Sequence, residues 1–151
     1  MFGGYLGGVD ERPDPFRLER FVTTQDPVFV SVLTELRAGQ KRSHWMWFVF
    51  PQLAGLGASP NATSFSISGL EEAAAYLEHP VLGPRLIECT ELVVAYGAGT
   101  LVKALGRPDD MKFHSSVTLF SLVTDQDSSF HTALAKHVPG GPDQRTLQLL
   151  L

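Results

Sequence analysis

The sequence contains very little cysteine and no long apolar run. Cys89 is the single cysteine among 151 residues. One cysteine cannot form an intramolecular disulfide, and it cannot provide the several thiolates of a structural zinc site. No apolar run approaches the roughly 18 residues of a membrane-spanning helix. The first residues, 1–8, also lack the basic and apolar regions of a signal peptide. We therefore expect a cytoplasmic protein with no membrane partner.

An excess of positive charge is also lacking. Twelve Lys and Arg residues stand against 16 Asp and Glu residues, which gives a formal charge of −4. Nonspecific nucleic-acid binding depends on a dense cationic surface that neutralises many phosphates. The composition argues against a nucleic-acid partner, although a local cluster of cations could still bind one phosphate.

The familiar motifs of cofactor and metal enzymes are missing as well. The sequence has no His-Glu-x-x-His metal motif, no phosphate-binding P-loop and no glycine fingerprint for dinucleotides. It also has no Gly-x-Ser-x-Gly nucleophile elbow. These absences argue against the common hydrolase, nucleotide-triphosphatase and dehydrogenase classes. We expect neither a metal nor a cofactor.

What the chain does have is enough apolar character for one core. Apolar residues make up 44% of the sequence and charged residues 19%, in a length that suits one domain. Residues 1–13 contain four glycines and few periodic apolar positions, so they are predicted to form a flexible N-terminal tail. Residues 14–151 show no internal repeat and no dividing linker, and they are predicted to form a single domain.

Signals that begin helices recur along this domain, so the predicted fold class is mainly α, a single compact multi-helical domain. An aspartate can cap free backbone N–H groups, and a following proline has a helix-ready φ. Ser68 and Glu71 have the spacing of a capping box. Gly39 is expected to end the second helix. The expected helices begin near Asp14-Pro15, Asp26-Pro27, Ser68, Gly83-Pro84, Thr100, Pro108, Asp127 and Asp143.

One stretch does not show a helical period. Residues 45–50 are six consecutive apolar residues, followed by Pro51. A run of this kind fits a buried strand and a buried helix equally well. The sequence leaves open which of the two the segment between Lys41 and Gln52 adopts.

The first candidate site lies at the start of this stretch. Two cations, a hydroxyl and an imidazole lead directly into bulky aromatic residues, and a glutamine amide follows. Cations could hold a phosphate while an indole stacks on a base or sugar. The alternative is a capped helix with core tryptophans and solvated cations. The candidate ligand-binding residues are Lys41, Arg42, Ser43, His44, Trp45, Trp47 and Gln52.

The second candidate site is expected on the helix that begins near Pro108. Lys112 is three residues from Ser115 and four from Ser116, so on a helix the three share a face. They could hold an anionic ligand, or they could form an ordinary solvated stripe. Asp109 and Asp110 are candidates for a catalytic acid or base, and their place at a helix start equally suits capping.

Several of these motifs together resemble the domain-of-unknown-function 1810 family. The long aromatic motif is specific, and the likeness extends from about Phe16 to Leu150. The resemblance implies a mainly α-helical cytosolic domain of bacterial type, and it implies no particular reaction. The matching stretches are residues 41–52, 55–57, 79–86 and 108–120.

A fainter likeness concerns the NADAR proteins, helical N-glycosidases that act on ADP-ribose-linked or riboflavin-precursor compounds. Residues 99–104 with Pro108-Asp109 resemble the Leu-Val-Glu-Ala and Pro-x-Asp region of that family. Lys103 stands where the family has Glu, and Asp110-Met111 does not continue into its Trp-Gly. The family's early acidic motif has no counterpart here.

Two functional hypotheses follow. In the first, the protein is an enzyme or sensor for a nucleotide-like or ADP-ribose-like phosphate compound, with Lys41, Arg42 and Lys112 on the phosphate. Hydrolysis of an N-glycosidic bond would then use Asp109 or Asp110 to assist water. In the second, the protein is a noncatalytic interaction module whose aromatic run is core. The sequence indicates no oligomeric state.

Overall fold

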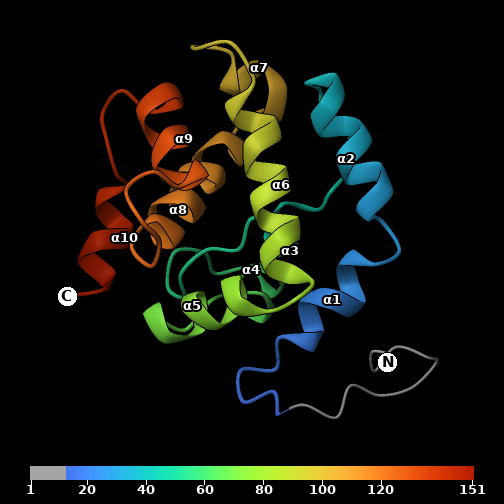
Figure 1. Ribbon diagram of the computed structural model, residues 1–151, viewed down its shortest axis with the longest axis vertical. Coiled ribbons are helices and arrows are strands. Elements are labelled where there is room, and N and C mark those ends of the chain that lie inside the picture. Colours follow the sequence, from blue (N-terminus) through green and yellow to red (C-terminus); the bar gives the residue numbers. More distant parts are fainter. Residues whose placement is uncertain (1–12) are drawn as a thin grey trace.

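Helices make up most of the regular structure in residues 13–151, as the capping signals predict (Figure 1). The computed structural model describes residues 13–151, so all of the predicted tail except Pro13 lies outside the described residues. These residues form one compact helical domain without a sheet, and the predicted fold class is confirmed. The helices are α1 (Glu19–Gln25), α2 (Phe29–Ala38), α3 (Met46–Val49), α4 (Pro60–Ser64), α5 (Leu70–Glu78), α6 (Leu82–Val94), α7 (Leu101–Leu105), α8 (Asp109–Ser121), α9 (Ser129–His137) and α10 (Gln144–Leu149).

The core is built around α6 and α8. In Figure 1, α6 crosses the middle of the molecule, and it packs against α2, α5 and α9. Helix α8 packs against α3, α5, α7, α9 and α10. Its side chains are therefore buried on several sides, and Phe113, Val117 and Phe120 are fully buried. Because α8 is packed on several sides, the side chains of its first turns extend from a rigid backbone.

Two of the predicted terminal residues act as expected. Asp14 accepts hydrogen bonds from the backbone N–H groups of Leu18 (2.7 Å) and Glu19 (3.0 Å), and so satisfies the start of α1. Gly39 ends α2 in the left-handed conformation, with φ of 66°, where a glycine avoids the steric penalty of a Cβ atom.

The helix predicted to follow Asp26-Pro27 is present, but the capping role of Asp26 was wrong. Asp26 ends α1, and its carboxylate pairs with Arg85 of α6 at 2.8 Å. Helix α2 begins two residues after Pro27 and has no side-chain cap. The aspartate is therefore used for a tertiary contact between α1 and α6, which the local sequence pattern cannot reveal.

Two further capping residues differ by one position from the prediction. The Ser68 backbone N–H and hydroxyl both donate to Glu72 at 2.9 Å, so Glu72 rather than Glu71 faces the helix start. Ser128, not Asp127, caps α9, where its hydroxyl accepts from the backbone N–H of His131. Neighbouring residues with the same capping chemistry explain both errors.

The junction between α5 and α6 depends on a glycine. A Cβ atom added to Gly83 would lie 2.1 Å from the carbonyl oxygen of Leu77, so any side chain there would displace the backbone. This contact lets α6 begin at Leu82 rather than near Pro84, which lies within its first turn. A proline is tolerated there because the first N–H groups of a helix have no internal partner.

Residues 45–50, which the sequence left open between strand and helix, form a short helix, α3, and the start of the connection that follows it. Helix α3 makes a single turn, and the chain then runs on to Leu53, which forms an isolated parallel bridge with Ile67. All but one of the six apolar side chains are buried; these are Trp45, Met46, Phe48, Val49 and Phe50. The sixth, Trp47, is half-buried.

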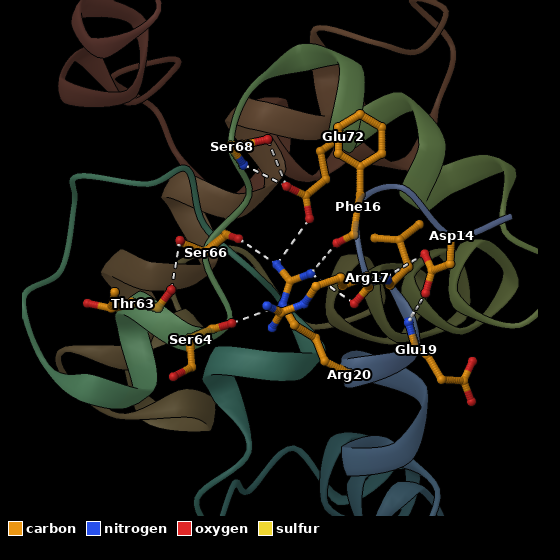
Figure 2. A network of polar contacts seen from close by, with 11 residues as sticks. Asp14, Phe16, Arg17, Glu19, Arg20, Thr63, Ser64, Ser66, Ser68 and Glu72 are labelled. Carbon is orange, nitrogen blue, oxygen red and sulfur yellow. Dashed lines mark hydrogen bonds and ion pairs between the residues drawn. The ribbon is translucent and has the colours of Figure 1, made fainter.

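Arg20 of α1 connects α1 with the residues after α4 and with α5 (Figure 2). Its guanidinium donates to the carbonyl oxygens of Ser64 (2.9 Å) and Ser66 (2.8 Å), and it pairs with Glu72 at 3.0 Å. Further bonds run to the carbonyls of Phe16 (2.6 Å) and Arg17 (3.0 Å). Since these partners occupy the guanidinium fork, Arg20 joins three segments rather than offering a ligand site.

Candidate functional site

A cavity of about 330 Å³ opens where α3, α8 and the start of α10 meet the loop that leads into α4. Trp47 comes from α3, and Gln52 from the connection that follows it. Helix α8 contributes side chains from its first turns, because its other side is fixed in the core. The polar and aromatic lining residues are Trp47, Gln52, Ser59, Lys112, His114, Ser115, Asp143 and Arg145.

A shared carboxylate connects this cavity with the segment that precedes α3. Asp109 Oδ2 lies 2.7 Å from Lys41 Nζ, and Asp109 Oδ1 lies 3.7 Å from Lys112 Nζ. The side chain of Lys41 is only 7% exposed, so its ammonium group needs this partner. Asp109 thus joins the two sequence motifs, although only Lys112 lines the cavity.

Each of the two lysines also lies over an indole ring. Lys41 Nζ is 5.0 Å from the ring centre of Trp45, and Lys112 Nζ is 4.7 Å from that of Trp47. Cation–π attraction at these distances fixes the direction of a long, flexible side chain. Lys112 is therefore held at the cavity by Asp109 on one side and by Trp47 on the other.

The segment before α3 is shaped by Glu35 of α2. Its carboxylate accepts from the backbone N–H groups of Arg42 (2.7 Å) and Ser43 (3.0 Å), from the Ser43 hydroxyl, and from Trp45 Nε1 (2.9 Å). Burial alone would raise the pKa of Glu35, but these hydrogen bonds outweigh it and lower the pKa from 4.5 to about 2. Sequence analysis did not identify Glu35.

Four of the predicted ligand-binding residues line the cavity together, namely Trp47, Gln52, Lys112 and Ser115. Lys41 adjoins them through Asp109. Arg42, Ser43 and His44 are exposed and lie outside the cavity lining. The two motifs are therefore neighbours. The motif at residues 41–52 lines the cavity with Trp47 and Gln52, and not with the cations at its start.

Two predicted residues are placed where no ligand could reach them. Trp45 is 1% exposed, and its indole N–H is used by Glu35, so it cannot stack on a ligand. Ser116 is fully buried, and its hydroxyl has no hydrogen-bond partner among the described residues. Both side chains turn inward because α3 and α8 pack against each other.

The two predicted acids do not line the cavity either. Asp109 is paired with the two lysines, and Asp110 is buried and pairs with Arg107 at 2.9 Å. Both stand in the first turn of α8, where the helix dipole favours acids. Asp110 Oδ1 is buried without a hydrogen-bond partner in the described part of the chain.

Four polar residues of the cavity were not predicted as site residues: Ser59 and the three described next. Asp143 accepts from Ser115 Oγ (3.0 Å) and from the backbone N–H (3.2 Å) and hydroxyl (2.6 Å) of Thr146. Burial alone would raise the pKa of Asp143, but the hydrogen bonds from Thr146 and Ser115 outweigh it and lower that pKa. The predicted helix start at Asp143 is confirmed, because this residue caps α10.

The other two are His114 and Arg145. His114 Nε2 lies 2.8 Å from the carbonyl oxygen of Gly141. A carbonyl can only accept, so Nε2 carries a proton and donates it to this carbonyl. Arg145 is exposed and has no ion pair among residues 13–151. No sequence signal indicated that Arg145 would lie beside Lys112.

Comparison with known proteins agrees with the helical architecture and the aromatic motif. The model of a family described as "Protein of unknown function (DUF1810)" matches residues 15–150. The chain belongs to the DUF1810 family. Among solved structures, it is similar to the conserved hypothetical protein Rv1873 from Mycobacterium tuberculosis, with 57% identity and a TM-score of 0.87. That match covers 91% of this chain and 98% of the other. Among curated proteins no match was found.

Metal and membrane features were sought in this DUF1810 domain as well. Within residues 13–151, no group of three or more His, Cys, Asp or Glu side chains could hold a metal ion. No helix in the described part of the domain is long and apolar enough to cross a membrane.

Proposed function

We propose that this DUF1810 protein binds a small, nucleotide-like phosphate compound in the cavity between α3, α8 and α10. The observation that supports it most is the meeting of Lys112, Arg145 and Trp47 at one cavity. An ammonium and a guanidinium group are the usual partners of a phosphate, and an indole face is the usual partner of a planar ring.

The balance of charge around the cavity favours an anion. Lys41, Lys112 and Arg145 carry three positive charges, and Asp109 and Asp143 carry two negative charges, which leaves an excess of one positive charge. The whole chain has a formal charge of −4. A compact anion is attracted by this local excess, whereas a long polyanion would also meet the acidic surface.

Hydrolysis of an N-glycosidic bond is the catalytic version of this proposal. A carboxylate that assists water must lie within hydrogen-bond reach of the ligand or of that water. Asp143 lines the cavity, whereas Asp109 and Asp110 are paired outside it. In the catalytic version, Asp143 therefore takes the role that the sequence suggested for Asp109 or Asp110.

A noncatalytic interaction module is the second candidate. It is favoured by the burial of Trp45, Phe48 and Phe50, which makes most of the aromatic run part of the core. This observation accounts for the aromatic motif without a ligand, but it does not account for Trp47 and the two cations at one cavity.

Calorimetric titration with AMP and ribose 5-phosphate tests the proposal. We expect micromolar to submillimolar binding of at least one compound, and a loss of about tenfold or more in Lys112→Met, because one charge-assisted hydrogen bond is worth about 1.5–3 kcal/mol. Lys103→Met removes an exposed lysine outside the cavity and should leave binding unchanged. Absence of binding of both compounds to the wild type would reject the proposal.

A further inference from the structure

We propose, on the basis of the proposed function, that the ligand carries a single planar ring with adjacent hydrogen-bond donor and acceptor atoms, and that the side-chain amide of Gln52 recognises this edge. The compound is then of mononucleotide size rather than dinucleotide size. Gln52 would be the residue that determines specificity, whereas Lys112 and Arg145 provide attraction for the anionic end.

The side-chain amide of Gln52 is available to a ligand. Its side chain makes no hydrogen bond with any of the described residues, although it lines the cavity. The donor and the acceptor of this amide are therefore both free to pair with a molecule in the cavity.

The backbone around Gln52 is firmly held, so the side chain extends from a fixed point of the cavity wall. The Gln52 carbonyl accepts from the Ile67 N–H at 2.8 Å, and the Ala54 N–H donates to the Ile67 carbonyl at 2.8 Å. Two residues earlier, Phe50 packs edge-on against Phe113 of α8, with ring centres 5.0 Å apart. The connection that carries Gln52 is therefore anchored on both sides.

Trp47 lines the same cavity and supplies the apolar surface. Its indole N–H has no hydrogen-bond partner within residues 13–151, and its ring is half-buried. Lys112 Nζ lies 4.7 Å from the centre of this ring, so a planar ligand ring would stack on the opposite face of the indole. Stacking uses only the face of the ligand ring, so its polar edge stays free for hydrogen bonds. An amide has a donor and an acceptor side by side, which matches the polar edge of a nucleobase in two parallel hydrogen bonds.

The size of the cavity limits the ligand to one ring and one anionic group. Its volume of about 330 Å³ is near the lower end of ligand cavities, which range over about 300–1,000 Å³. Lys112 and Arg145 line the same cavity and supply two cations for a phosphate. The second ribose of a dinucleotide would project outside.

Calorimetry with three probes tests this inference, using AMP, ribose 5-phosphate and ADP-ribose. For the wild type, we expect AMP to bind about tenfold more tightly than ribose 5-phosphate, and ADP-ribose no more tightly than AMP. Gln52→Leu should weaken AMP binding by about tenfold and leave ribose 5-phosphate unchanged, because two neutral hydrogen bonds contribute about that factor. Gln148→Leu, at an exposed position on α10 outside the cavity lining, is the matched control.

The outcomes separate the two proposals. Equal binding of AMP and ribose 5-phosphate, or AMP binding that Gln52→Leu leaves unchanged, overturns the role of Gln52 while the phosphate site stands. ADP-ribose binding tenfold tighter than AMP overturns the size limit. Failure of all three probes to bind the wild type overturns both proposals. Melting temperatures of the variants confirm that each is folded before titration.

Discussion

Lys41 and Lys112 share the carboxylate of Asp109, one on each oxygen, at 2.7 and 3.7 Å. Each lysine also lies over the indole of a different tryptophan, Trp45 or Trp47. Lys41 and the buried Trp45 lie toward the core, whereas Lys112 and Trp47 line the cavity. This arrangement explains how a buried structural cluster can hold a cation in place at the cavity.

Replacement of Asp109 by Asn should lower the free energy of unfolding by about 2–4 kcal/mol, because it leaves the nearly buried Lys41 ammonium without a counter-charge. Urea denaturation measures the loss. Asp26→Asn breaks the more exposed pair with Arg85 and should cost less than about 1 kcal/mol. Equal losses in the two variants would show that the Lys41–Asp109 pair contributes no more than a surface contact.

The hydrogen bonds to Glu35 predict a pH dependence of stability. Because the pKa of Glu35 falls from 4.5 to about 2 in the folded protein, its contribution is fully present above about pH 4.5 and is lost as the pH falls toward 2. Thermal denaturation should find Glu35→Gln less stable than the wild type at pH 7. The difference should shrink between pH 4.5 and 2. A difference that is constant over this range would contradict the assignment.

Gly83→Ala should destabilise the protein by about 3 kcal/mol or more, because its Cβ atom would lie 2.1 Å from the Leu77 carbonyl oxygen. Gly140→Ala is the control, since nothing lies within 4 Å of the Cβ atom that it adds. We expect the control to change stability by less than about 0.5 kcal/mol in chemical denaturation. A folded Gly83→Ala variant of wild-type stability would mean that α5 and α6 can move apart freely.

Arg20→Lys should cost about 2–3 kcal/mol although it keeps the positive charge. A lysine ammonium cannot reproduce the planar fork that reaches Ser64, Ser66 and Glu72 at once (Figure 2). Urea denaturation of Arg20→Lys beside Arg17→Lys, an exposed neighbour whose side chain has no partner among the described residues, isolates the effect. Similar stability of both variants would show that charge alone matters at Arg20.

Much of the fold could be predicted from sequence because helix starts are local. Asp14 and Gly39 act through backbone groups within five residues, so their chemistry is visible in the sequence itself. Asp26 has the same local pattern, but its carboxylate is used by Arg85, 59 residues away. A local signal cannot show which of two partners a side chain will take.

The candidate site was less predictable for the same reason. A run of six apolar residues has no period, so it could not distinguish the buried Trp45 from Trp47 at the cavity. Arg145 is far from Lys112 in sequence and reaches the cavity because α10 packs against α8. The two sequence motifs contain α3 and α8, which both line the cavity. Which of their side chains face the cavity depends on tertiary packing.

The central claim is that Lys112 and Trp47 together bind the phosphate and the ring of one small ligand. The most direct measurement is calorimetric titration of AMP into the wild type, Lys112→Met, Trp47→Ala and the control Lys103→Met. We predict micromolar to submillimolar binding by the wild type and the control, and a loss of about tenfold or more in each cavity variant. No binding by the wild type, or binding that both cavity variants retain unchanged, would contradict this account.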